Sequence, residues 1–339
     1  MTIRDQLQQT IDDMVDERRG ILAADESAAT IKKRFDAVGV ESTEENRRAY
    51  RSLLLDTEGL GEYICAVILF EETLAQKNAS GVPLPDVAWM QEIVPGIKVD
   101  KGKGPLPGAP GDLITAGLDG LGERLKTYTE QGARFAKWRE VYPITPANPT
   151  PLGLHANAEM LARYAAVCQE LGVVPIVEPE VLMDGDHDID RCAAVTEQVL
   201  HSVFHALHRH GIVFEHMLLK PNMVLPAQGC RRADPQEVAE ATLRVMRRSV
   251  PAAVPSINFL SGGQGPEEAT QNLNAINQSR GQAPWQLSIS YGRALQQPAL
   301  KAWGGKAQNR AAAQAALLKR ARLNSLARQG QYQTSMEAG

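Results

Sequence analysis

The sequence predicts an α/β protein built as a closed (β/α)8 barrel, and three observations lead to that prediction. Eight short apolar, β-branched runs recur along the 339 residues, and each ends in polar or charged side chains. Helix-like segments separate most of these runs, which is typical of parallel βα units. After the first run, Asp25, Glu26 and Ser27 stand where an open dinucleotide-binding sheet would carry G-x-G-x-x-G. The barrel is therefore favoured, and an open doubly wound sheet is the alternative.

The predicted strands follow one another in chain order. They span residues 20–25, 65–71, 93–100, 135–142, 173–180, 217–222, 256–261 and 286–293. Two of the intervening segments, residues 156–171 and 191–210, each place their apolar residues on one stripe, which predicts amphipathic helices packed on the sheet.

The ends and long loops complete the predicted organisation. Residues 1–19 are expected to form an amphipathic acidic helix, and residues 100–111 (DKGKGPLPGAPG) a loop of turn residues. Residues 307–327 are rich in Ala, Arg and Leu and predict a C-terminal helix, followed at 328–339 by a short polar tail that we expect to be mobile. No Pro-, Gly- and Ser-rich linker divides the chain, so residues 1–339 are expected to form a single domain.

The composition excludes several classes of protein. Apolar residues make up 43% and charged residues 22%, as in a soluble globular protein, and the net charge of −4 predicts no nucleic-acid or membrane partner. No run is long and apolar enough to span a bilayer, and residues 1–19 have no signal-peptide core, so a cytoplasmic location is expected. The four cysteines form no C-x-x-C pair and are expected to be reduced.

Charged and polar residues gather at the predicted carboxyl ends of the strands, where barrel enzymes carry their catalytic groups. Any one of them could be a structural ion pair, but together they predict an active site, because barrel interiors prefer branched apolar residues. Alternate residues of a strand share a face, so Lys137 points with Arg139 and Glu178 with Glu180. The strand-end residues are Asp25, Glu26, Ser27, Glu71, Lys98, Asp100, Lys137, Arg139, Glu178, Glu180, Lys220, Asn222, Ser261, Gly262, Gly263, Ser290, Gly292 and Arg293.

Lys220 closes the apolar run of residues 214–219, where a charged ammonium is costly unless it has a partner or a function. By itself it is compatible with a lysine whose head reaches water, or with a desolvated amine nucleophile.

Two anion sites are predicted at the mouth of the barrel. Ser261-Gly262-Gly263 and Gly292-Arg293 follow the last two strands, where barrel enzymes frequently bind phosphate through backbone N–H groups. A second site is expected opposite, from Ser27, Thr30, Lys98 and Arg34. A substrate with two phosphates would suit this arrangement.

Nine motifs, in order, resemble those of class I fructose-bisphosphate aldolase. They are residues 23–27 (AADES), 43–48 (TEENRR), 96–102 (GIKVDKG), 135–139 (FAKWR), 176–180 (IVEPE), 218–223 (LLKPNM), 259–264 (FLSGGQ), 290–295 (SYGRAL) and 301–305 (KAWGG). The resemblance runs from about residue 20 to about residue 332 and implies a homotetrameric glycolytic or gluconeogenic lyase that needs no metal or other cofactor.

The resemblance also implies a role for each site residue. Lys220 would form the Schiff base with the ketone of fructose 1,6-bisphosphate, and Glu178 would be the acid/base for carbinolamine dehydration. Glu180 and Lys137 would support proton transfer, and Asp25 would take the proton of the C4 hydroxyl. The phosphate near C1 would be held by Ser261, Gly262, Gly263, Ser290, Gly292 and Arg293. Ser27, Thr30, Arg34 and Lys98 would hold the other phosphate or grip the bisphosphate, and Arg139 is a further substrate-binding residue that matches the family's pattern less closely.

Physical chemistry adds two expectations. Burial and the charge of Lys137 would favour the neutral amine of Lys220, and burial beside Glu180 would raise the pKa of Glu178.

The sequence departs from the family's pattern in three places. Thr30 stands where a serine is usual, Glu71 stands where many relatives have histidine, and the tail that ends in a tyrosine in animal members has no counterpart after Tyr332. The preference between fructose 1,6-bisphosphate and fructose 1-phosphate is left open by the last of these.

Three further clusters of polar residues are expected to have no functional role. His201, His205 and His208 lie opposite an apolar helix face and are expected to be solvated rather than zinc ligands, and residues 185–188 (GDHD) to form a turn. The basic cluster Lys319, Arg320 and Arg322 is expected on a solvated helix face. Another Schiff-base sugar-phosphate lyase and a non-catalytic binding protein on the same barrel are the alternative functions.

Overall fold

Eight parallel strands close into a barrel, as the sequence predicts, in a computed structural model that describes residues 2–338. Around the barrel the order is β1-β2-β3-β6-β7-β8-β9-β10, and β10 pairs with β1, so the open-sheet alternative is wrong. The strands are β1 (Gly20–Ala24), β2 (Ile64–Leu69), β3 (Val94–Lys98), β6 (Phe135–Tyr142), β7 (Val174–Val181), β8 (Leu218–Leu219), β9 (Ser256–Phe259) and β10 (Gln286–Tyr291).

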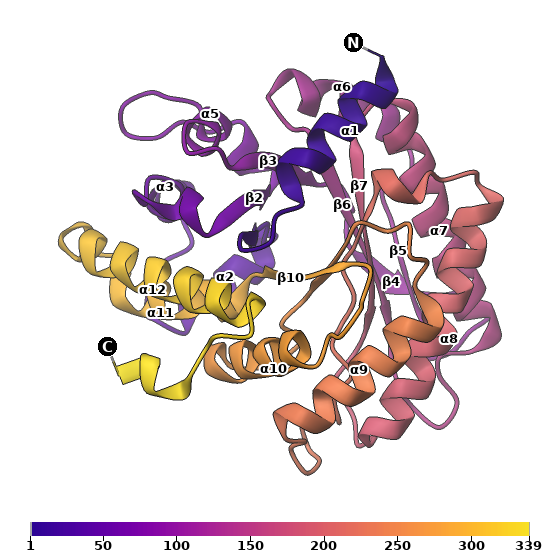
Figure 1. The fold of residues 1–339 in the computed structure, drawn as a ribbon. Helices are drawn as coiled ribbons and strands as arrows, with labels where there is room; N and C mark the ends of the chain where they lie inside the picture. Colours follow the sequence, from indigo (N-terminus) through magenta and orange to yellow (C-terminus); the bar gives the residue numbers. More distant parts are fainter. Residues whose placement is uncertain (1, 339) are drawn as a thin grey trace.

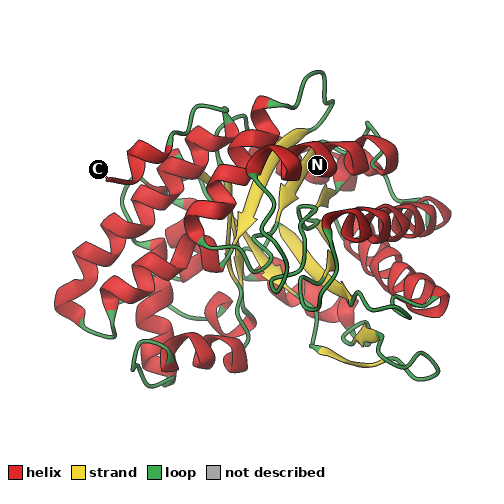
Figure 2. Ribbon diagram, turned by 90° about the horizontal axis from the view of Figure 1, so that it is seen from below, coloured by secondary structure: helices red, strands yellow, loops and turns green. Residues whose placement is uncertain are grey.

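Helices surround the strands on all sides and cover their outer faces (Figure 2). They are α2 (Ala28–Asp36), α3 (Glu44–Leu55), α4 (Glu71–Leu74), α5 (Leu84–Trp89), α6 (Leu121–Glu130), α7 (Pro151–Glu170), α8 (Ile189–Arg209), α9 (Pro235–Ser249), α10 (Pro266–Gln278) and α11 (Arg293–Trp303), with short 3-10 turns at Leu60–Glu62 and Phe214–His216. The helices predicted at 156–171 and 191–210 are α7 and α8. Each begins slightly earlier than its apolar stripe because Thr150 and Asp188 cap the first turns.

The amino-terminal helix α1 (Ile3–Met14) closes the barrel at the start of the strands (Figure 1). It ends five residues before the predicted boundary, because Asp16 accepts the backbone N–H groups of Arg18 and Arg19 in a turn. Its buried face, Leu7, Ile11 and Met14, packs with the apolar side chains that fill the barrel interior.

A small antiparallel hairpin, β4 (Lys103–Pro105) and β5 (Leu113–Thr115), begins within residues 100–111, the segment predicted as a loop, and ends just after it. Each strand has only three residues, which is too few to give a strand signal. The hairpin is fixed to the barrel by Glu140, whose fully buried carboxylate accepts the backbone N–H of Thr115 (3.1 Å) and the indole N–H of Trp138 (2.8 Å).

The carboxyl-terminal segment is packed, so the predicted mobile tail is wrong. After the turn Ala307–Asn309, helix α12 (Arg310–Arg328) leads to a second turn, Thr334–Ala338. Arg320 is 3% exposed and binds both carboxylate oxygens of Glu337, at 2.5 and 2.6 Å. The Tyr332 hydroxyl also donates to Glu337, at 2.9 Å.

The expected solvated basic face of α12 is therefore also wrong for Arg320, because a carboxylate from the tail gives its charge a buried partner. Lys319 is half-buried and donates to the Glu337 carbonyl (2.5 Å), and Arg322 is exposed.

The other signals that we weighed as structural lie at ordinary positions. His201, His205 and His208 are exposed on α8. Within residues 2–338 no group of metal-ligating side chains is gathered, and Cys65, Cys168, Cys192 and Cys230 are free thiols. None of the helices in the described part of the chain has the length and apolarity to cross a membrane.

Candidate active site

The structure brings the sixteen residues to which the resemblance gives a role to one cavity of about 930 Å³ at the carboxyl ends of the strands. These residues come from the ends of the strands and from the first two turns of the helices that follow them, which is how a barrel concentrates polar groups. The residues are Asp25, Ser27, Thr30, Arg34, Lys98, Lys137, Arg139, Glu178, Glu180, Lys220, Ser261, Gly262, Gly263, Ser290, Gly292 and Arg293. Of the other strand-end residues, Glu26, Glu71 and Asp100 also line the cavity, whereas Asn222 is buried elsewhere and donates to and accepts from neighbouring segments.

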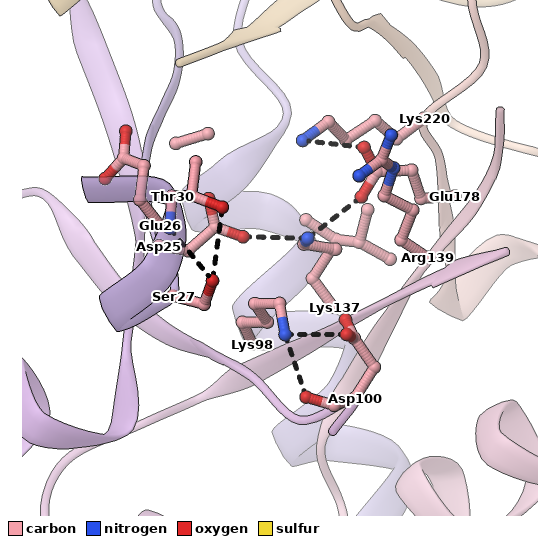
Figure 3. A network of polar contacts seen from close by, with 12 residues as sticks. Asp25, Glu26, Ser27, Thr30, Lys98, Asp100, Lys137, Arg139, Glu178 and Lys220 are labelled. Carbon is pink, nitrogen blue, oxygen red and sulfur yellow. Dashed lines mark hydrogen bonds and ion pairs between the residues drawn. The ribbon is translucent and has the colours of Figure 1, made fainter. Parts of the chain in front are cut away.

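A chain of alternating charges crosses the floor of the cavity (Figure 3). Lys220 Nζ lies 3.2 Å from Glu178 Oε1, and Glu178 Oε2 lies 3.0 Å from Lys137 Nζ. The same Lys137 ammonium lies 2.7 Å from Asp25 Oδ2. Lys137, Glu178 and Lys220 are each at most 4% exposed, so the four groups form a buried network with equal numbers of positive and negative charges.

The network keeps Asp25 and Lys137 ionised. Burial by itself would raise the pKa of Asp25, but the charges of Lys137 and Lys220 outweigh burial and hold that pKa well below its usual range. Burial would likewise lower the pKa of Lys137, but the carboxylates of Asp25 and Glu178 raise it well above the usual value. Lys137 is therefore a fixed cation between two carboxylates.

The expectation for Glu178 is wrong. Burial raises its pKa, but Lys137 and Lys220 at hydrogen-bond distance outweigh burial, so the net pKa of Glu178 is lowered and the group is a carboxylate in the resting site. Glu180 does not oppose this effect, because it is paired with Arg139. Lys137, the other cation beside Glu178, lies between Asp25 and Glu178.

One side of the cavity is formed by the two glycine turns. Gly262 and Gly263 have φ of +45° and +83°, a region that glycine adopts without strain. Gly292 precedes the first turn of α11, whose unpaired N–H groups and dipole favour an anion. The buried hydroxyl of Ser290 lies at the same wall and has no hydrogen-bond partner among the described residues.

The first turn of α2 forms a further part of the lining. The sequence predicts that it lies opposite the glycine turns, but it lies beside Gly292, because β1 pairs with β10 and a Cβ on Gly292 would lie 3.6 Å from an Arg34 nitrogen. Ser27 caps this helix, and its hydroxyl lies 3.1 Å from that of Thr30. Lys98, nearby, is paired with Asp100 at 2.6 Å (Figure 3). Arg34 reaches the cavity while bound to the buried carboxylate of Glu26.

Sequence reasoning did not give Glu26 a role. The structure shows it as the anchor of Arg34, because Glu26 also binds Arg51 (2.5 Å) and accepts from Gln296 Nε2 (2.8 Å). It stands within the AADES motif, but no local pattern identifies partners that are distant in sequence.

The lining as a whole is positively charged in a protein whose net charge is negative. Ten lysine and arginine side chains and six aspartate and glutamate side chains line the cavity, an excess of four positive charges. Four of the cations, Lys33, Lys101, Lys103 and Lys301, were not among the predicted site residues. Such a cavity attracts anionic substrates.

Comparisons with known proteins agree with this geometry. A family model described as "Fructose-bisphosphate aldolase class-I" matches residues 6–339. Cytosolic fructose-bisphosphate aldolase 4 of Arabidopsis thaliana is 56% identical over 322 residues, covering 95% of this chain and 82% of that protein. Fructose-bisphosphate aldolase 1 of Toxoplasma gondii is 56% identical over 317 residues, covering 93% of this chain and 87% of that protein.

A solved structure gives the same result for the fold. The structure of fructose-bisphosphate aldolase from Plasmodium falciparum superposes with a TM-score of 0.96 at 51% sequence identity, covering 98% of this chain and 96% of that one. Family, sequence and fold thus agree across nearly the whole chain, and the chain belongs to the class I fructose-bisphosphate aldolases, the lyases that cleave fructose bisphosphate through a Schiff base.

Proposed function

We propose that Lys220 is the amine with which this aldolase attacks the ketone carbon of fructose 1,6-bisphosphate. The observation that carries the proposal is the contact between Lys220 Nζ and Glu178 Oε1, at 3.2 Å, at the buried end of a cavity with an excess of cations. Glu178 is an acceptor at hydrogen-bond reach of a charged lysine, which is the geometry needed to remove a proton from the nucleophile.

Glu178 then serves as base and as acid in succession. It accepts a proton from the Lys220 ammonium, and the neutral amine adds to C2 to form a carbinolamine. Glu178 returns the proton to the carbinolamine hydroxyl, which leaves as water and gives the iminium. Ammonium plus ketone becomes iminium plus water without a change in net charge, so the pairing with Glu178 is preserved. The carboxylate state of Glu178 in the resting site suits the first of these steps.

Asp25 is proposed to act on the bond that breaks. It accepts the proton of the C4 hydroxyl, the C3–C4 electron pair moves toward the iminium nitrogen, and glyceraldehyde 3-phosphate leaves with a new carbonyl at C4. Protonation of the resulting enamine at C3 and hydrolysis then release dihydroxyacetone phosphate. Lys137 contacts both Asp25 and Glu178 and holds them in place throughout. Glu180 orients Arg139 at the edge of the site.

Two sets of lining residues are proposed to hold the two phosphates. Ser261, Gly262, Gly263, Ser290, Gly292 and Arg293 would bind the phosphate near C1, since a helix N-terminus and an unpartnered hydroxyl meet there. Ser27, Thr30, Arg34 and Lys98 would bind the other phosphate, with help from Arg139. The excess of cations supports a doubly phosphorylated substrate.

Borohydride trapping tests the assignment of the nucleophile. The enzyme is incubated with dihydroxyacetone phosphate, reduced with borohydride and digested, and the adduct is located by mass spectrometry; we expect it on Lys220. Lys220→Met should abolish both the adduct and cleavage while inorganic phosphate still binds. An adduct on another lysine, turnover by the variant, or loss of activity with a chelator would refute the proposal.

We further propose a single domain, a homotetramer and a cytoplasmic location. Packing of α12 against β1, β10, α10 and α11 supports one domain, and the relatives named cytosolic or cytoplasmic support the location. The tetramer rests on the family resemblance. We expect one unfolding transition, a light-scattering mass of four chains, and recovery of the protein in the cytosolic fraction of fractionated cells. Two transitions would contradict the single domain, another mass the tetramer, and another compartment the location.

A further inference from the structure

Two buried amide side chains lie behind the wall proposed to bind the phosphate near C1. Gln264 follows Gly263 directly, and Asn272 lies two turns along α10. Each is 2% exposed, and neither lines the cavity. Buried amides are costly unless they are hydrogen-bonded, so the partners of these two side chains indicate what they hold.

Gln264 holds the turn of Ser261, Gly262 and Gly263 closed. Its side-chain Nε2 donates to the Ser261 carbonyl at 2.9 Å, and its backbone N–H donates to the same oxygen at 3.0 Å. Its Oε1 accepts from Asn272 Nδ2 at 2.7 Å. Asn272 thereby sets the orientation of the Gln264 amide, because its donor requires the oxygen of Gln264 on that side and leaves the nitrogen facing Ser261.

The same amide touches the segment that carries Lys220. Gln264 Nε2 lies 3.6 Å from the sulfur of Met223, three residues after Lys220. The two segments are also joined directly, since the Leu260 N–H donates to the Pro221 carbonyl at 3.0 Å. The turn and the lysine segment are therefore fastened to each other on the side away from the substrate.

We infer that Gln264 and Asn272 are positioning residues that fix the distance between the phosphate turn and Lys220. A phosphate bound at the turn places C2 beside the Lys220 amine only if the turn is held at one position, and an alignment error of about 1 Å is enough to cost two orders of magnitude in rate. The inference rests on the phosphate assignment proposed above and adds the residues that make that site rigid.

The test removes the orienting donor with a side chain of the same branching and the same number of heavy atoms. In Asn272→Leu, Gln264 loses the bond that sets its amide, so the oxygen is free to turn toward the Ser261 carbonyl and the turn loosens. Asn277→Leu is the matched control: Asn277 is also buried on α10, and its Nδ2 donates to the Leu273 and Leu287 carbonyls, away from the turn.

The readout is the concentration of dihydroxyacetone phosphate that half-saturates borohydride trapping on Lys220. Because Asn272→Leu loses one orienting hydrogen bond, we expect this half-saturating concentration to rise about tenfold while the yield of adduct at saturation stays the same. Inorganic phosphate should compete more weakly by a similar factor. Asn277→Leu is expected to stay within about twofold of the unaltered enzyme, although both variants melt at lower temperature. A purely structural role would lower both melting temperatures without moving the trapping midpoint.

An unchanged midpoint in Asn272→Leu, or an equal shift in Asn277→Leu, would overturn the inference. If inorganic phosphate does not compete in the unaltered enzyme, the phosphate assignment itself is wrong, which separates the two failures. Gln264→Met provides a second variant should Asn272→Leu not fold. Methionine keeps the length of the side chain and its packing against Met223, but it removes both hydrogen bonds of the Gln264 side-chain amide. We expect the same increase in the trapping midpoint.

Discussion

Lys137→Met tests the charge network at its centre. Lys137 is 3% exposed and lies 2.7 Å from Asp25 and 3.0 Å from Glu178, so it is the cation that both carboxylates share. Methionine has nearly the length and volume of the lysine stem, and the substitution therefore removes the charge with little loss of packing.

The loss of unfolding free energy can be judged from the two carboxylates, Asp25 and Glu178, that remain without their shared cation. Removing one partner of a buried pair typically costs 3 to 5 kcal/mol, because the other partner keeps its desolvation cost. Lys220 still neutralises part of the charge, and the Asp25 side chain is 13% exposed to the open cavity, so a value near the lower end, about 3 kcal/mol, is expected at pH 7. Turnover should fall by about 10²-fold, since Asp25 and Glu178 lose their common donor.

The assay is urea unfolding of both proteins from pH 7 down to about pH 2.5, below the ordinary pKa of an aspartate. Folding lowers the pKa of Asp25 below its ordinary value of 3.8, so its stabilising contribution is fully present above that pH and is lost as the pH falls through the folded pKa. The variant lacks this contribution. The difference in unfolding free energy between the two proteins should therefore be largest near neutral pH and should shrink as acid protonates the carboxylates.

Arg139→Met is the matched control, on the same strand and two residues along. The Arg139 side chain is 38% exposed, so solvent screens its pair with Glu180 and the expected loss of stability is at most about 1 kcal/mol. The reasoning is refuted if Lys137→Met is no less stable than Arg139→Met at pH 7, or if the difference from the unaltered enzyme does not shrink in acid.

Three further predictions concern packing, pH and the tail. Gly96→Ala should lower the melting temperature, because the added Cβ would lie 2.4 Å from ring atoms of Phe135, and overpacking of this kind costs about 1 to 3 kcal/mol. Burial raises the pKa of Glu140 to about 7, so the folded enzyme loses stability as the pH rises from about 4.5 through 7. Glu140→Gln should flatten this dependence of the unfolding free energy on pH, measured by urea unfolding from pH 5 to pH 8. Arg320→Met should release the packed tail, which limited proteolysis would detect as faster cleavage after residue 328, whereas Arg322→Met should not change the rate.

Each of these has an outcome that would contradict it. For the packing prediction, Gly122→Ala is the control, because its Cβ would meet nothing within 4 Å in helix α6 and should leave the melting temperature equal or higher. Equal effects of the two alanines would argue against overpacking. If the unfolding free energies of the unaltered enzyme and Glu140→Gln depend on pH in the same way, the account of Glu140 is wrong. Equal rates of cleavage in Arg320→Met and Arg322→Met would contradict the role of the contact between Arg320 and the tail.

Much of the site was predictable because of how a barrel is built. Polar residues after an apolar strand all reach the same end of a closed parallel sheet, so a list such as Asp25, Lys137, Glu178 and Lys220 predicts proximity without any knowledge of distances. The same reasoning could not assign partners. It set Lys137 beside Lys220 as a source of repulsion, whereas the two cations are separated by the carboxylate of Glu178.

Other features were not predictable because they depend on contacts between distant segments. The polar composition of residues 328–339 predicts a mobile tail, but the buried guanidinium of Arg320 needs an anionic partner and pairs with Glu337 of the tail. Strand β4 lies in a segment predicted as a loop, residues 100–111, because the β4–β5 hairpin is attached by a carboxylate on another strand, Glu140.

The sequence by itself determined the barrel and the rim of polar strand ends, and it predicts the lysine that we propose as the nucleophile, because alternation, strand spacing and motif order are properties of the chain itself. The tertiary structure decided which charges meet. It made Glu178 a carboxylate with a lowered pKa, put Gln264 and Asn272 behind the turn of Ser261, Gly262 and Gly263, and tied the tail to α12. The physical reason is that the pKa of a buried group depends on charges a few ångströms away, and those distances exist only once the chain has folded.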